Sequence, residues 1–143
     1  MQALQKDVQG NKAKGPSSQT IDRKEAEDLR RVLQILDQFG EYSQTMPIQI
    51  ARAFVVTALN EGKSLRELTE LSDQRLSTMS RHMLDLQEPN RSKGEGYKLV
   101  EARTSPDELR KKEYRLSKRG RMLKDRLVNI VRGGTSTDPQ QQR

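Results

Sequence analysis

Residues 64–87, with the sequence SLRELTELSDQRLSTMSRHMLDLQ, decide the fold of this chain. The first part predicts a short helix, because Ser64 and Glu67 have the spacing of a capping box at a helix start. Three leucines in this helix have the spacing of one inner face: Leu65, Leu68 and Leu71. Ser72-Asp73 then breaks the pattern. The stretch therefore begins as a short helix followed by a tight turn.

A second helix is expected from about residue 73 to Gln87, and Pro89 stops it. Four apolar side chains with helical spacing should face the core: Leu76, Met79, Met83 and Leu86. The other side of the helix is polar, with Gln74, Arg75, Ser77, Thr78, Arg81, His82 and Asp85. Two short helices joined by a break of this length are typical of a helix-turn-helix unit.

The chain after this unit predicts a β-hairpin. A basic loop from Asn90 to Gly96 leads to two β-like runs, Tyr97–Arg103 and Lys111–Leu116, with a turn signal at 104–107 between them. Strand alternation places Lys112, Tyr114 and Leu116 toward the core and Lys111, Glu113 and Arg115 away from it. The fold class is therefore mainly α with a small β-hairpin wing, a winged helix-turn-helix.

Three further helices are expected on either side of this unit, at about Asp22–Phe39, Pro47–Glu61 and Lys118–Arg132. Asp22 and Glu25 have capping-box spacing at the start of the first, and Ser117 is expected to cap the last. The first carries an apolar stripe of Leu29, Val32, Leu33 and Leu36, and the second is apolar on nearly every face, which predicts a central position in the core. Residues 1–20 are expected to be a flexible polar arm and residues 133–143 a disordered tail. One domain, residues 21–132, remains between them.

Charge is concentrated in one part of the chain. The net charge is +7, and residues 91–132 alone hold 14 basic and 6 acidic side chains, a net charge of +8. A local positive field points to a polyanionic partner, with nucleic acid first and an anionic membrane surface second. No apolar run reaches the roughly 18 residues of a membrane helix, and no signal-peptide core is present, which predicts a cytoplasmic protein.

The polar side of the helix at 73–87 suits the major groove of double-stranded DNA. Arg and Gln side chains bind guanine and adenine in bidentate fashion, and hydroxyl groups bind phosphates. Ser and Thr are poor residues for the middle of a helix, which favours a role in binding over a merely solvated face. The candidates in this helix are Gln74, Arg75, Ser77, Thr78, Ser80, Arg81 and His82. Met79 and Met83 are expected in the core.

The hairpin supplies a second candidate surface. Its basic tip would suit the minor groove, where Arg is attracted by the negative potential. The candidates are Arg103, Arg110, Lys111 and Lys112, with Arg91 and Lys93 in the preceding loop as phosphate contacts. The alternative is a winged-helix module that docks a protein, such as RNA polymerase or another DNA-bound protein.

No catalytic constellation emerges from the sequence. The serines have no partnered base, Gly94-Glu95-Gly96 lacks the context of a phosphate loop, and the chain has no Cys and one His. We therefore expect neither an enzyme nor a bound metal or cofactor.

Residues 46–120 resemble the MarR family of winged-helix transcription regulators. The matching stretches are Ser64–Leu68, Leu76–Arg81, Leu99–Arg103 and Leu116–Gly120. Where the family's wing commonly has Asp-x-Arg, this chain has Glu108-Leu109-Arg110. The resemblance implies that Arg110 enters the minor groove and that Glu108 orients it. The long loop before the wing is similar to that of phage and prophage members, which would place the protein in a host cytoplasm.

The family resemblance also implies a homodimer formed through the terminal helices. The residues expected at that interface are Leu33, Leu36, Leu127 and Val131. The last helix is short, about 22 Å at 1.5 Å per residue, so the usual dimer geometry does not transfer directly. With only two Phe, three Tyr and no Trp, the chain gives no indication of the family's aromatic-ligand pocket, and no small-molecule effector is assigned.

Overall fold

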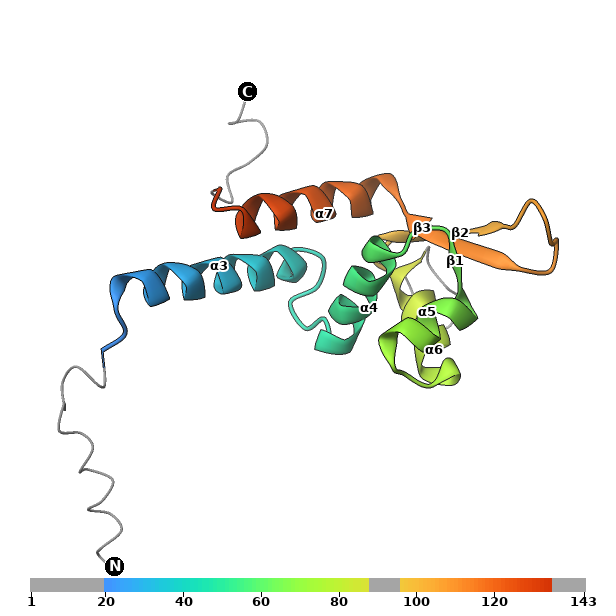
Figure 1. Cartoon of the computed structure of the whole chain (residues 1–143), viewed down its shortest axis with the longest axis horizontal. Coiled ribbons are helices and arrows are strands. Elements are labelled where there is room, and N and C mark those ends of the chain that lie inside the picture. Colours follow the sequence, from blue (N-terminus) through green and yellow to red (C-terminus); the bar gives the residue numbers. More distant parts are fainter. Residues whose placement is uncertain (1–19, 88–95, 135–143) are drawn as a thin grey trace, which may run out of the picture.

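The computed structural model describes residues 20–87 and 96–134. Its helices and strands follow one another in an order that matches the predicted winged helix-turn-helix: α3 (Arg23–Gly40), α4 (Ile48–Leu59), β1 (Lys63–Ser64), α5 (Leu65–Ser72), α6 (Leu76–Leu86), β2 (Val100–Thr104), β3 (Lys112–Leu116) and α7 (Lys118–Val131). Figure 1 shows α3 and α7 side by side at one end and the β2–β3 hairpin at the other, with α4, α5 and α6 packed together between them.

The core lies where α4, α5 and α6 meet the sheet. Phe54, Leu68, Met79, Met83 and Leu86 are fully buried there, which confirms the predicted core role of both methionines. The capping box of α5 is formed as predicted: the Glu67 N–H donates to Ser64 Oγ (3.2 Å), and the Ser64 N–H donates to Glu67 Oε1 (2.8 Å). These local bonds fix the start of α5 beside the sheet.

Helix α6 begins later than the sequence predicts. Asp73 ends α5 in the left-handed conformation (φ 59°), and Arg75 is the extended N-cap residue of α6, so Gln74 and Arg75 precede the helix. Leu76, predicted to be buried, is 45% exposed because it lies in the first turn, outside the core. Leu71 is likewise exposed at the last turn of α5, although its spacing placed it inward.

The sheet has three antiparallel strands in the order β1-β3-β2, one more than predicted. Strand β1 is two residues long and pairs Lys63 with Tyr114. Strand β2 starts at Val100, not at Tyr97, because residues 97–99 bind the end of α6: the N–H groups of Tyr97 and Leu99 donate to the carbonyls of Asp85 (2.9 Å) and Leu86 (2.8 Å). The last carbonyls of α6 have no partner within the helix, so residues 97–99 bind them and do not form part of the strand.

Strand β3 follows the predicted alternation near its end, where Tyr114 and Leu116 are buried. Lys112 is on the same side but exposed, because it lines an open hollow together with Tyr114 and does not enter the core. The prediction that the Lys112 side chain faces the core is therefore wrong, because this side chain is exposed.

Helices α3 and α7 are joined by polar contacts between the end of one and the middle of the other. The Arg126 guanidinium donates to Gln38 Oε1 (2.9 Å) and to the Tyr42 hydroxyl (3.2 Å), and Arg119 stacks 4.7 Å from the centre of the Tyr42 ring. Phe39 packs edge-on against Phe54 of α4, with ring centres 5.9 Å apart. The end of α3 is therefore anchored, while its first half extends beyond the core (Figure 1).

Two apolar faces are exposed, one on α3 and one on α4. The four stripe residues of α3 are all half exposed or more, and α4 is buried on one side only, with Ile48 at 70% and Leu59 at 76% exposure. Helix α4 is nevertheless central to the core, as predicted: it contacts α5, α6 and β3, and Ile50, Ala53 and Phe54 are buried.

No helix in residues 20–87 and 96–134 has the length and apolar character needed to cross a membrane. The same residues contain no group of three or more His, Cys, Asp or Glu side chains placed to hold a metal ion.

Candidate nucleic-acid interface

The solvent side of α6 carries five of the seven side chains predicted to bind DNA from the recognition helix. Met79, Met83 and Leu86 face the core, so the opposite side of the helix is open. Ser77 and Arg81 are exposed on it, and Thr78, Ser80 and His82 are half-buried at its borders. The start of this surface is formed by Arg75, which is exposed, and Gln74, which is half-buried.

The tip of the wing is a loop closed by backbone bonds. The Ser105 N–H donates to the Lys111 carbonyl (2.8 Å), and the Lys111 N–H donates to the Glu108 carbonyl (3.0 Å). Ser105 is buried, and its hydroxyl accepts from the Asp107 N–H (3.3 Å). Glu108, Leu109 and Arg110 are all exposed at the tip. The loop therefore has a defined backbone and free side chains.

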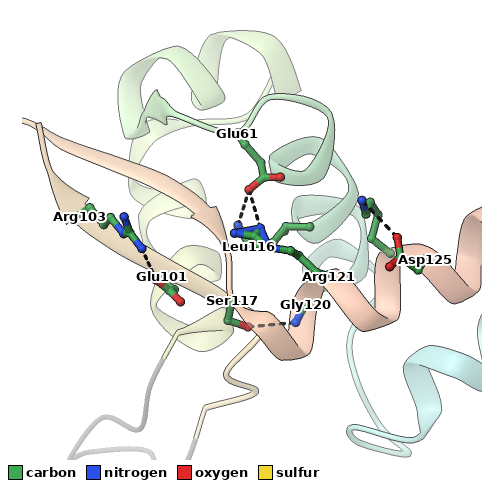
Figure 2. Close-up of polar contacts among 9 residues, drawn as sticks. Glu61, Glu101, Arg103, Leu116, Ser117, Gly120, Arg121 and Asp125 are labelled. Atoms are coloured by element: carbon green, nitrogen blue, oxygen red, sulfur yellow. Dashed lines mark hydrogen bonds and ion pairs between the residues drawn. The ribbon is translucent and has the colours of Figure 1, made fainter.

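The two arginines Arg103 and Arg110 of the wing differ in whether they form an ion pair. Arg103 is exposed on β2 and lies 3.7 Å from Glu101 on the same strand (Figure 2). Glu108 and Arg110 form no ion pair with each other; the ion pairs among the described residues lie elsewhere. Arg110 is thus open to a ligand, whereas Arg103 is partly neutralised by Glu101.

A hollow of about 620 Å³ brings the helix-turn-helix and the wing together. It is open to solvent, and its walls come from the start of α5, the first residue of α6 and the wing. Four basic side chains and one carboxylate line it: Arg66, Arg110, Lys111, Lys112 and Glu67. The start of α6 and the basic part of the wing therefore share one side of the molecule. Arg66 was not among the candidates from the sequence, where nothing distinguishes it from other exposed arginines.

The base of the wing is fixed by a glutamate that sequence reasoning also missed. Glu61 Oε1 accepts the Leu116 N–H of β3 (3.0 Å) and lies 3.5 Å from Arg121 Nη1 of α7 (Figure 2). The neighbouring Gly62 N–H donates to the Tyr114 carbonyl (2.7 Å). These bonds connect residues more than fifty positions apart, and they set the direction in which the wing leaves the core.

Ser117 also contributes to the attachment of α7 at the base of the wing. Its hydroxyl accepts the Gly120 N–H (3.0 Å) as the cap of α7 (Figure 2). The same hydroxyl donates to the Lys98 carbonyl (2.7 Å). The predicted helix start at Ser117 is confirmed. The wing and α7 are thereby held in one fixed arrangement.

Two groups in this region have shifted pKa values. Hydrogen bonds from the backbone and hydroxyl of Ser64 lower the pKa of Glu67, with a smaller contribution from Lys111, so this carboxylate stays charged at neutral pH. Burial raises the pKa of the Tyr114 phenol.

The remaining predicted residues are placed as follows. Arg91 and Lys93 lie outside the described residues. Of the residues expected at a dimer interface, Leu33, Leu36 and Val131 are 57%, 52% and 63% exposed, whereas Leu127 is half-buried and packs against the core of its own chain.

No family model matches the chain, and no curated protein matches it. Among solved structures, Rv1404 from Mycobacterium tuberculosis is similar, with 19% identity, 73% of this chain and 66% of that chain covered, and a TM-score of 0.58. Streptococcus pneumoniae FabT in complex with DNA has 16% identity, covers 78% of each chain and has a TM-score of 0.50. The MarR family transcription regulator SP03579 has 20% identity, 73% and 62% coverage and a TM-score of 0.49.

This chain therefore spans about two thirds of the length of Rv1404 and slightly less of SP03579. At these identities the likeness establishes the fold alone. The predicted winged helix-turn-helix fold is confirmed at that level.

Proposed function

From the MarR-type winged-helix fold, we propose that this chain is a transcription regulator that binds specific sequences in double-stranded DNA. One observation carries the proposal: the first residue of α6 and the basic wing line the same hollow, so the helix and the wing lie close enough to bind adjacent grooves. The similarity to FabT, solved in complex with DNA, supports this function.

In this proposal the start of α6 enters the major groove. Arg75 and Arg81 are exposed there and suit bidentate binding to guanine, and Gln74 suits adenine. The hydroxyls of Ser77, Thr78 and Ser80 then bind phosphates and fix the register, with His82 at the border of the contact.

The wing enters the neighbouring minor groove. Arg110 extends from the exposed tip, where a guanidinium favours the narrow minor groove of A·T-rich DNA. Lys111, Lys112 and Arg103 supply positive charge beside it. Glu108 would orient Arg110 only in the complex, since the two are not paired in the free protein.

We propose further that the chain acts as a homodimer through α3 and α7. The apolar stripe of α3 and Val131 of α7 lie exposed on neighbouring helices, where a two-fold partner would bury them.

The substitution Leu33→Asp tests this dimer, because it places a charge in the middle of the stripe and removes little from the chain's own core. We expect this variant to sediment as a monomer at tens of micromolar. A wild-type protein that sediments as a monomer there would contradict the dimer.

Selection of random duplexes on the purified protein, followed by sequencing, tests DNA binding and symmetry together. A palindromic consensus supports both proposals, because a two-fold dimer binds two equivalent half-sites. Salt titration separates DNA binding from the protein-docking alternative, since each phosphate contact contributes about −0.9 to the slope of log K against log salt. Absence of any selected sequence and of any salt-dependent binding would favour protein docking by the exposed Leu109 and its neighbours.

A further inference from the structure

The hollow between α5 and the wing has a strongly unbalanced charge. Arg66 comes from α5, and Arg110, Lys111 and Lys112 come from the wing, against the single carboxylate of Glu67. Within residues 20–87 and 96–134, none of these four cations forms an ion pair. Four cations against one carboxylate around an open hollow form an electrostatic site for an anion.

The geometry of B-DNA identifies the anion that would occupy this hollow. When a helix lies in the major groove and a wing in the adjacent minor groove, one phosphodiester strand separates the two grooves and must run between helix and wing. The hollow lies between the first residue of α6 and the wing. It is therefore in the path of that strand.

We propose that this hollow seats the phosphodiester strand between the two grooves, with Arg66 and Lys111 as cations on opposite walls and the Glu67 carboxylate as a repulsive group that lowers the affinity. This inference rests on the proposed function. It assigns Arg66 to backbone binding, which carries no sequence information, in contrast to Arg75 and Arg81.

The role of Glu67 follows from its contacts. Its carboxylate accepts the Ser64 N–H at 2.8 Å and so stabilises the start of α5. The same hydrogen bonds keep it ionised, so it presents a negative charge on the wall of the hollow at neutral pH. One residue thus stabilises the fold and weakens sequence-independent DNA binding.

The chain contains a matched control for both residues. Helix α3 begins with the same kind of capping box, in which Asp22 and Glu25 exchange hydrogen bonds of 2.8 and 3.3 Å. Lys24 occupies the second helical position there, as Arg66 does in α5, and Glu25 matches Glu67. The start of α3 lies far from the wing (Figure 1).

The experiment measures binding of a random-sequence duplex by the full-length chain over a range of salt concentrations. Arg66→Gln should reduce the salt slope by about 0.9 per bound protomer, which corresponds to about fivefold weaker binding at 0.15 M salt. Arg66→Lys should retain the wild-type slope. Glu67→Gln, which keeps a capping side chain, should bind more tightly than the wild type. Lys24→Gln and Glu25→Gln should match the wild-type slope.

The outcomes separate this inference from the proposed function. If the wild type shows no salt-dependent binding to any duplex, the proposed function fails. If the wild type binds but Arg66→Gln has the same slope as Lys24→Gln, the strand does not pass through the hollow, and the function stands. Should Arg66→Gln fail to fold, Glu67→Gln decides: binding equal to or weaker than wild type overturns the inference.

Discussion

Substitution of Gly120 by alanine tests how α7 is attached to the wing. Gly120 is a buried residue in the first turn of α7, and a Cβ atom there would overlap the Leu99 carbonyl oxygen and lie 3.3 Å from Phe54 Cε1. The obstacle is backbone, which does not move aside as a flexible side chain would. The Leu99 carbonyl also accepts the Ser117 N–H (3.1 Å), so displacement would disturb the start of the helix.

Two opposing effects decide the magnitude. Replacing glycine by alanine within a helix stabilises it by about 1 kcal/mol. Overpacking a filled site costs about 1–3 kcal/mol, and a weakened hydrogen bond costs about 1 kcal/mol more. We therefore expect Gly120→Ala to reduce the free energy of unfolding by about 1–3 kcal/mol. With a urea m-value of about 2 kcal/mol per molar, the midpoint should fall by roughly 0.5–1.5 M.

Gly40→Ala is the control. Gly40 is the last residue of α3, and no atom lies within 4 Å of the position that its Cβ would occupy. Alanine should leave the midpoint unchanged or raise it slightly. Both variants should be compared at one protein concentration, because a dimer makes unfolding concentration-dependent. Equal midpoints for the two variants would show that α7 is not seated against the Leu99 backbone.

Three other predictions concern DNA binding and pH. Arg81→Ala should cost about 1–3 kcal/mol on the selected sequence and much less on random DNA, as measured by fluorescence anisotropy; equal losses would indicate a phosphate contact. Arg110→Ala should weaken binding most on A·T-rich flanks, and Glu108→Ala should weaken binding too, although it adds net positive charge; tighter binding by Glu108→Ala would refute its orienting role. Because the pKa of Glu67 is lowered from its ordinary value of 4.5, the stability it contributes is present above that value and is lost as pH falls through the folded-state pKa. Urea midpoints from about pH 6 to 3 should therefore change less for Glu67→Gln than for the wild type.

Features that depend on neighbouring residues could be predicted from the sequence. The capping boxes at Asp22 and Ser64 and the cap at Ser117 are formed as expected, because each requires only a side chain and a backbone group three positions away. Helical spacing likewise identified Met79 and Met83 as core residues. The order of elements and the resemblance to a known family then sufficed for the fold.

Features that depend on distant contacts could not be predicted. Strand β1 is two residues long and exists only because it pairs with β3. Glu61 binds a backbone N–H 55 positions away, and nothing in its own neighbourhood indicates that partner. The later start of β2 has the same origin, since the unpaired carbonyls at the end of α6 attract residues 97–99.

The apolar stripe of α3 shows a different limit of sequence reasoning. Periodicity identifies the side of a helix that avoids water, but it does not distinguish the chain's own core from a surface that a partner covers. In α3 that side is exposed along most of its length, and only its last residues, Gln38 and Phe39, are buried. A stripe built from leucine and valine at helical spacing is costly to leave in water, at about 25 cal/mol for each Å² of apolar surface. This stripe includes Leu33 and Leu36, which were expected at a dimer interface, and its exposure is therefore the physical argument for a second copy. The end of α3 held by Arg126 would fix its direction toward that copy.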